Sequence, residues 1–247
     1  FACEKLLELD SIKISRETLR LWLIEDGSLK SRRKKKAHRS WRDRKAHFGE
    51  MVQMDGSEHD WLEGRGPKLT MMGFIDDATS SVFGRFYEYE GTLPAMDGLK
   101  RYIETYGIPK SIYLDKHSTY VINRALTLEE ELSGAKKPLT QFERAADELG
   151  VELINAHSPQ AKGRIERSFK THQDRLIKEM RLKGIDNRHD ANAYIEEYCA
   201  KHNAKYAVAA KEKADFHVKG ARKRDLDGIL CVREKRTLKN DNTVSYE

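Results

Sequence analysis

The sequence predicts an α/β domain in which a five-stranded mixed sheet is covered by helices. Apolar patterns that are typical of strands and helices follow one another in the order strand, strand, strand, helix, strand, helix, strand, helix, helix. The connection from the third strand through a helix to the fourth implies a parallel pairing within the sheet. A length of 247 residues with 38% hydrophobic residues allows one such domain with smaller appendages. We place the domain at 48–206.

The first three strands are expected at 50–55, 68–76 and 82–89. Gly and Pro at 64–67 and the polar run at 77–80 separate them, which favours an antiparallel meander. Asp76 and Asp77 begin the second turn. Capping of the turn by their side chains explains them better than a role as extra metal ligands.

Alternating helices and strands complete the domain. Leu93, Met96, Leu99 and Ile103 recur every three or four residues and predict a helix over 92–106. Further strands are expected at 111–115 and 151–156, and further helices at 141–149, 163–182 and 190–202. A polar insertion occupies about 117–139.

Residues 2–26 predict two short helices, and Ser15 is a good N-cap for the second. Together they suit a partial helix-turn-helix at 1–27, whose second helix would place Arg16 and Arg20 against DNA. The alternative is a helical pair that serves packing.

The segment 28–47 is predicted to be a basic linker. Ten basic residues and a single acid lie between Lys30 and Lys45, while the whole chain has a net charge of only +6 and a pI of 9.0. So many like charges repel one another and favour phosphate as a partner. The DNA-binding candidates here are Arg32, Arg33, Lys34, Lys35 and Lys36.

The tail, 207–247, is basic and polar. Residues 228–238 and 243–246 predict a hairpin around 239–242, as the start of a small β domain. The first residue is Phe1 rather than Met, so we expect a fragment of a longer protein.

Composition excludes several classes of protein. The three cysteines are far apart and have no zinc-ligand spacing, which fits a reducing, intracellular compartment. No apolar run is long enough to cross a membrane, so no membrane partner is expected.

Three acids form the candidate active site. Asp55 and Asp115 each end a predicted strand, and Glu166 lies about 100° from the apolar stripe of the 163–182 helix. Carboxylates that converge in this way need a cation, and all-oxygen sites favour Mg²⁺ or Mn²⁺. Two such ions are the usual device for displacement at phosphorus. The alternative for any one of these acids is a turn or surface residue.

From about 48 to 206 the chain resembles the DDE transposases related to retroviral integrases, and among them the ISNCY-type insertion-sequence transposases. The resemblance is carried by VQMDGS at 52–57, HDW at 59–61, EGRG at 63–66, FIDDATS at 74–80, YLDKHS at 113–118 and NAHSPQAKGRIER at 155–167. The last block is the most specific.

The resemblance implies a ribonuclease-H-like fold with Asp55, Asp115 and Glu166 as the metal-binding triad. The first aspartate would bridge two Mg²⁺ or Mn²⁺ ions. The expected reaction frees a 3′-hydroxyl at the end of the element, and this hydroxyl then attacks target DNA without a covalent enzyme intermediate. Asp115 and Glu166 lie 51 positions apart, farther than in retroviral integrases. The excess at about 125–138 is a lid, a DNA-contacting arm or a tolerated loop.

Basic residues flank the acids. Lys116, His117, Lys162, Arg164 and Arg167 are candidates to hold DNA phosphates over the metal ions. Arg164 and Arg167 could instead balance the carboxylates.

The expected partners are the element ends and target DNA, bound by a dimer or higher oligomer in the bacterial cytoplasm, at the nucleoid. Two alternatives stay open: a nuclease of the same fold that cuts without joining, and a non-catalytic DNA-binding regulator.

Overall fold

The computed structural model describes residues 1–29, 43–115, 120, 139–155, 163–238 and 243–244. The chain forms two compact units, Phe1–Arg42 and Asp43–Glu247. Most of the basic linker and most of the 117–139 insertion lie outside the described residues. No helix among the described residues is long and apolar enough to span a membrane.

The first unit contains the two predicted helices, α1 (Ala2–Asp10) and α2 (Arg16–Glu25). The Ser15 hydroxyl accepts a hydrogen bond from the Thr18 amide at 3.0 Å, which confirms the predicted N-cap. Arg16 and Arg20 are both exposed, and Arg20 forms an ion pair with Glu17 at 2.6 Å.

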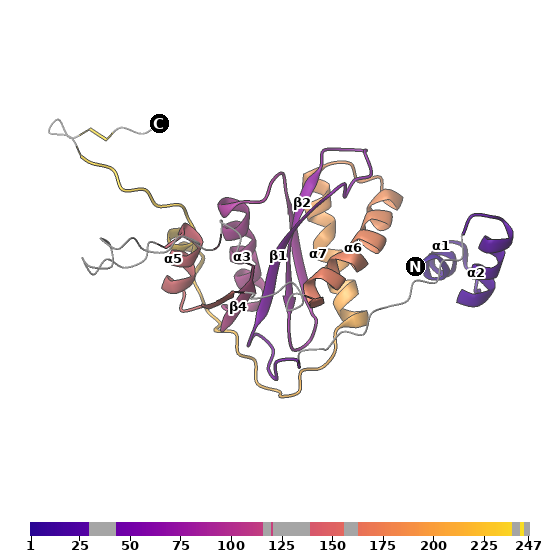
Figure 1. Ribbon diagram of the computed structural model, residues 1–247, viewed down its shortest axis with the longest axis horizontal. Helices are drawn as coiled ribbons and strands as arrows, with labels where there is room; N and C mark the ends of the chain where they lie inside the picture. The colour runs from indigo at the N-terminus through magenta and orange to yellow at the C-terminus, as the bar shows by residue number, and fades with distance from the viewer. Residues whose placement is uncertain (30–42, 116–119, 121–138, 156–162, 239–242, 245–247) are drawn as a thin grey trace, which may run out of the picture. The chain divides into compact units, whose positions relative to one another are not determined.

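The second unit is built on a five-stranded mixed sheet (Figure 1). Its strand order is β3-β2-β1-β4-β5, and the three strands of the meander pair antiparallel as predicted. The last two strands are parallel to β1 and to each other. The strands are β1 (Val52–His59), β2 (Leu69–Asp76), β3 (Val82–Tyr87), β4 (Ser111–Leu114) and β5 (Glu152–Asn155).

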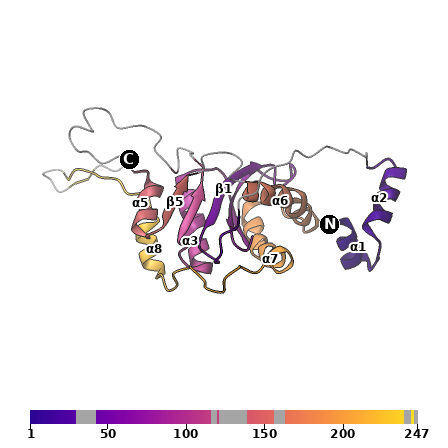
Figure 2. The same cartoon turned by 60° about the horizontal axis from the view of Figure 1, so that its bottom comes forward.

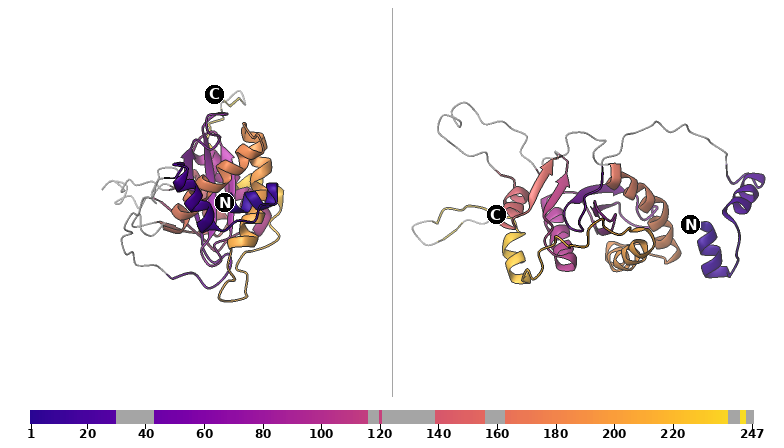
Figure 3. Two further views of the ribbon diagram at one scale, coloured as in Figure 1. Left: turned by 90° about the vertical axis from the view of Figure 1, so that its right-hand side faces the viewer. Right: turned by 90° about the horizontal axis from the view of Figure 1, so that it is seen from below.

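Helices cover both faces of the sheet. Figures 1 and 3 show α3 (Thr92–Tyr106) and α5 (Gln141–Glu148) on one face, and α6 (Gly163–Leu182) and α7 (Arg188–Tyr206) on the other. Successive side chains of β2 point to opposite faces of the sheet. Met72 and Phe74 belong to the core under α3, whereas Met71 and Ile75 belong to the core under α6 and α7. This is the predicted α/β fold.

The tail differs from the prediction. Residues 223–229 form a helix, α8 (Lys223–Ile229), which lies beside α5 in Figure 2, and the described part of 230–238 contains no strand. Leu226 and Leu230 are buried in the core under α3. The Arg144 guanidinium on α5 also donates to the carbonyl oxygens of Ile229 and Cys231. The hairpin prediction was therefore wrong for 228–238: residues 228–229 end α8, and Ile229 and Cys231 are held by Arg144 of α5.

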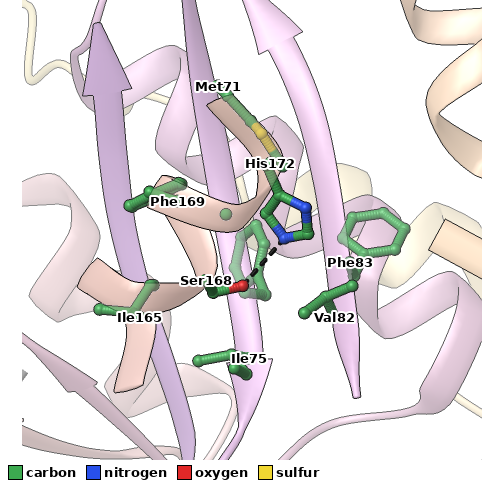
Figure 4. Close-up of a pocket in the computed structure, with 10 residues that line it drawn as sticks. Met71, Ile75, Val82, Phe83, Ile165, Ser168, Phe169 and His172 are labelled. Carbon is green, nitrogen blue, oxygen red and sulfur yellow. Dashed lines mark hydrogen bonds between the residues drawn. The ribbon is translucent and has the colours of Figure 1, made fainter. Parts of the chain in front are cut away.

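His172 joins α6 to α7 inside the core. Its ring nitrogens lie 2.9 Å from the Ser168 hydroxyl and 2.9 Å from the Tyr198 hydroxyl. The neighbouring cavity of about 10 Å³ in Figure 4 has room for roughly one water molecule, so it is no substrate pocket. Burial lowers the pKa of His172 to about 3, and the nearby His202 adds to this effect. His172 is therefore neutral in the folded protein at neutral pH.

We expect His172→Gln to flatten the loss of stability in acid. The pKa of His172 is lower in the folded state, so the unfolded chain takes up a proton first, and stability is lost as the pH falls from about 6.5 toward 3. Below pH 6 the free energy of unfolding of the wild type should change by about 1.4 kcal/mol more per pH unit than that of the variant. Urea unfolding at pH 4.5, 5.5 and 7 measures this, and equal slopes would contradict it.

Candidate functional site

The parallel pairing of β1 with β4 places two of the predicted acids side by side. Val52 pairs with Ile112 and Gln53 with Tyr113, an offset of 60 positions. The same offset puts Asp55 opposite Asp115, the first residue after β4. The two acids therefore lie at the point where β4 ends.

Asp55 does not end its strand, contrary to the prediction. β1 continues to His59, because its antiparallel partner β2 accompanies it as far as the pair of His59 with Leu69. Asp55 itself is paired with Gly73 of β2. The aspartate is thus paired with β2 on one side, and on the other side it lies level with the end of β4.

The third acid is carried by α6, whose path along β1 is defined by three contacts. The Ile165 amide donates to Oε1 of Gln53 at 3.3 Å, and Nε2 of Gln173 donates to the Ser57 hydroxyl at 3.3 Å. Between them, the Phe169 ring lies over Gly73, the partner of Asp55. Glu166 follows Ile165 directly, so it lies in the first turn of α6, beside the part of β1 that holds Asp55.

All three acids are half-buried. Val52 and Met54 are buried in the core under α3, so by strand alternation Asp55 points to the face that α6 covers. Asp55, Asp115 and Glu166 therefore come from two neighbouring strands and from the helix that crosses them. The structure brings these predicted positions together near the carboxyl end of β4.

A fourth carboxylate, Glu90, lies near the two aspartates, and no motif in the sequence indicated it. A Cβ atom on Gly56 would lie 2.5 Å from the Glu90 carboxyl carbon, so this side chain packs directly on the backbone next to Asp55. Burial raises the pKa of Tyr120, and the charges of Glu90, Asp55 and Asp115 raise it further. Negative charge therefore gathers around this buried tyrosine.

The chemistry of these side chains fits Mg²⁺ or Mn²⁺, because carboxylate oxygens are the ligands that these ions prefer. Within the described residues, however, no three acidic, histidine or cysteine side chains approach closely enough to hold a metal ion. Asp55, Asp115 and Glu166 are thus placed by their backbones at one edge, without forming a closed cluster of ligands.

Asp76 has the predicted role in the turn. Its carboxylate accepts hydrogen bonds from the amides of Ala78, Thr79 and Gly49 at 3.1–3.2 Å. Burial nevertheless raises its pKa to about 6.

Asp77 has contacts with distant segments of the chain, beyond the capping role predicted for it. Its buried carboxylate accepts hydrogen bonds from the Arg164 guanidinium at 2.6 Å, from the Gln53 amide group at 2.9 Å and from the Lys45 backbone amide at 2.9 Å. Sequence reasoning missed these contacts because the partners lie far away in the chain.

The basic candidates have different environments. Arg164 forms an ion pair at 2.6 Å with Asp77, a carboxylate outside the predicted triad. Arg167 is exposed and donates through Nε to the Gly163 carbonyl oxygen at 2.8 Å. Partial burial and the positive charges of Arg164 and Arg44 lower its pKa. Lys116, His117, Lys162 and the five linker candidates, Arg32, Arg33, Lys34, Lys35 and Lys36, lie outside the described residues.

Two curated proteins are similar in sequence. The putative transposase y4bF of Sinorhizobium fredii is 39% identical over 251 aligned positions, which cover the whole chain and 53% of that protein. The transposase for insertion sequence IS1202 of Streptococcus pneumoniae is 34% identical over 181 positions, 72% of the chain and 37% of that protein. The chain belongs to the transposase family of these relatives. It spans about half of the length of the first relative. No protein-family model matches it.

The fold agrees with this membership. A chain of the simian T-cell lymphotropic virus intasome, solved with the PP2A regulatory subunit B56 gamma, superposes with a TM-score of 0.54 at 15% identity. The match covers 85% of this transposase chain and 71% of the other chain. Together with the strand order, this confirms the predicted ribonuclease-H-like fold.

We expect Gly73→Ala to weaken the packing of α6. The new Cβ would lie 2.7 Å from the Phe169 ring, and overpacking of this kind costs about 1–3 kcal/mol. Gly84→Ala is the matched control on the paired strand, where the Cβ would mainly meet the flexible end of Met71. Chemical unfolding should show the larger loss for Gly73→Ala and partial recovery with Phe169→Leu. An equal loss in the two glycine variants would contradict the expectation.

Proposed function

We propose that this chain contains the catalytic core of a transposase that cuts DNA at the ends of an element and joins those ends to target DNA. The observation that carries the proposal is the placement of Asp55 and Asp115 at the end of β4, with Glu166 in the first turn of the helix that crosses β1. Both sequence relatives are named transposases, which supports the same reaction class.

In the proposed site, Asp55, Asp115 and Glu166 would hold two Mg²⁺ or Mn²⁺ ions. Such ions activate the attacking oxygen and stabilise the leaving oxygen in a displacement at phosphorus. The three carboxylates supply oxygen ligands and negative charge, and the helix and strands hold them at a common edge. The side chains would close on the ions by rotation, since the described conformation leaves them short of a complete cluster.

The reaction we propose has two displacements. In the first, water attacks the phosphodiester at the end of the element, and the bond to the 3′-oxygen breaks to leave a 3′-hydroxyl. In the second, that hydroxyl attacks a phosphodiester of the target and displaces another 3′-oxygen. The number of phosphodiester bonds is conserved in the second step, so no external energy source is needed.

Two alternatives make different predictions for one assay. A nuclease of this fold would release 3′-hydroxyl ends without joining them, and a regulator would bind DNA only. A pre-cut end, target DNA and Mg²⁺ or Mn²⁺ distinguish the three, because only a transposase yields joined product.

DNA contacts in this proposal come from three regions: the N-terminal helix pair, the basic linker and the surroundings of the acids. The helix pair α1–α2 would place Arg16 and Arg20 in a groove, and Arg32, Arg33, Lys34, Lys35 and Lys36 of the linker would bind phosphates. Lys116, Lys162 and Arg167 belong to the same proposal near the acids, whereas the guanidinium of Arg164 is engaged by Asp77. Two element ends must be held together, so a dimer or higher oligomer is the proposed active form.

The triad predicts a shared loss of both reactions. Asp55→Asn, Asp115→Asn and Glu166→Gln should each lower cleavage and strand transfer by at least about 100-fold, the scale at which essential electrostatic groups act. DNA binding, measured by fluorescence anisotropy, should change little.

Asp174→Asn is the matched control, because Asp174 lies exposed on the same helix and pairs only with Lys178 among the contacts resolved for it. It should keep wild-type activity. Unchanged strand transfer in Asp115→Asn would sink the assignment of the triad.

The basic linker predicts a salt effect. Replacing Arg32, Arg33, Lys34, Lys35 and Lys36 with Gln should weaken binding to all DNA sequences alike. Each phosphate contact contributes about 0.9 to the slope of log K against log salt, so the slope should fall by up to roughly 4.5 in magnitude. Anisotropy titrations from 50 to 300 mM salt measure it, and an unchanged slope would exclude phosphate contacts by these five residues.

A further inference from the structure

Asp77 joins three segments that are distant in the sequence. Its carboxylate is fully buried and accepts hydrogen bonds from Arg164 of α6, Gln53 of β1 and the Lys45 backbone amide. A carboxylate can accept this many hydrogen bonds, and the guanidinium supplies the compensating charge. A buried ion pair therefore lies at the end of β2, at a position distant in the sequence from Asp115 and Glu166.

Gln53 extends this network to the backbone of α6. Its Nε2 donates to Asp77, and its Oε1 accepts from the Ile165 amide at 3.3 Å. That amide lies in the first turn of the helix, where backbone N–H groups have no partner within the helix. Both polar ends of the fully buried Gln53 side chain are therefore used to fix the start of α6.

Stability alone does not explain such a network. Apolar residues in place of a buried ion pair are often neutral or stabilising, because the desolvation of both charges offsets their attraction. The apolar stripe of α6, with Phe169 and Leu176, already binds the helix to the sheet. Apolar contacts are not directional, so they permit small shifts of the helix along the strand. Hydrogen bonds to Arg164 and Ile165 restrict such shifts.

We propose that Asp77 is a positioning residue for the transposase reaction: with Gln53 and Arg164 it fixes the first turn of α6 on β1 and so holds Glu166 beside Asp55. This inference rests on the proposed function. Glu166 lies one residue after Ile165 and two after Arg164, so it cannot shift independently of these two anchors. Gln53, in turn, is two residues before Asp55 on the same face of β1. The network therefore connects the backbones that carry two of the three acids.

The same carboxylate also fixes the chain where it leaves the basic run. Lys45, the last basic residue of that run, donates its backbone amide to Asp77, and the neighbouring Arg44 donates to the Ala78 carbonyl and to the Ser80 hydroxyl. The entry of the linker into the core and the start of the catalytic helix thus share one anchor.

The test is Asp77→Asn in the 247-residue chain. Asparagine keeps an oxygen for one donor but loses the charge that pairs with Arg164. We expect kcat for strand transfer to fall at least tenfold, while KM for DNA stays within twofold. Backbone amides of 163–169 should exchange with deuterium at least tenfold faster, and those of α7 should keep their wild-type rates.

Asp97→Asn is the matched control. Asp97 is also ion-paired, with Arg85 at 3.3 Å and Arg101 at 3.5 Å, but it lies on α3, away from α6. It should leave both kcat and the exchange of 163–169 unchanged. Arg164→Lys provides a second variant if Asp77→Asn does not fold, because it keeps the charge and loses the planar guanidinium. It should show the same local increase in exchange to a smaller degree.

The outcomes separate the inference from the proposed function. Wild-type kcat and wild-type exchange at 163–169 in both Asp77→Asn and Arg164→Lys would overturn the inference. A uniform rise in exchange over the whole second unit would also overturn it, since this would show a purely structural role. A wild-type chain without strand transfer under any metal condition would count against the proposed function, and the exchange measurement would still decide whether Asp77 positions α6.

Discussion

The parallel pairing of β1 with β4 is the constraint on which the candidate site depends. Its offset places Asp55 opposite Asp115, the first residue after β4. β2 continues along β1 past this point and keeps Asp55 within a paired strand. Because the β2 residue opposite Asp55 is Gly73, the Phe169 ring can approach the sheet there. The Asp55–Gly73 pair thus fixes the position of Asp55 and also allows the close approach of α6, the helix that carries Glu166.

Apolar contacts and hydrogen bonds both hold α6 against the sheet, and each has a different effect on the helix. Burial of Phe169, Leu176 and Met180 supplies the attraction between α6 and the sheet, in proportion to the apolar area removed from water. Hydrogen bonds at Gln53 and Ser57 select the position along β1, because they tolerate little change in distance or angle. The first set is spread over the helix, whereas the second is concentrated near the acids, where position matters for chemistry.

Local patterns were sufficient to predict much of this fold. The bounds of α3 and α6 agree with the 3.6-residue periodicity, and β4 ends at Leu114, one residue before the predicted end at Asp115. What failed depends on partners distant in the chain. β1 extends to His59 because β2 pairs with it that far. Asp77 forms an ion pair with Arg164, 87 residues later in the chain. The spacing of Leu226, Ile229 and Leu230 suits a helix, but the surface that buries it comes from α3 and α5, more than 70 residues earlier in the chain. The placement of the triad for metal binding stays a prediction.

Charge divides the region around the first turn of α6. The negative charges of Glu90, Asp55 and Asp115 add to the effect of burial in raising the pKa of Tyr120. The positive charges of Arg164 and Arg44 lower the pKa of Arg167, and Arg164 is paired with Asp77. A DNA phosphate would be repelled by the carboxylates and attracted by the arginines, so DNA alone would not settle over the acids. In the proposed reaction, divalent cations bound by the carboxylates would make the local charge positive. Metal ions would therefore have to bind before the scissile phosphate can approach Asp55.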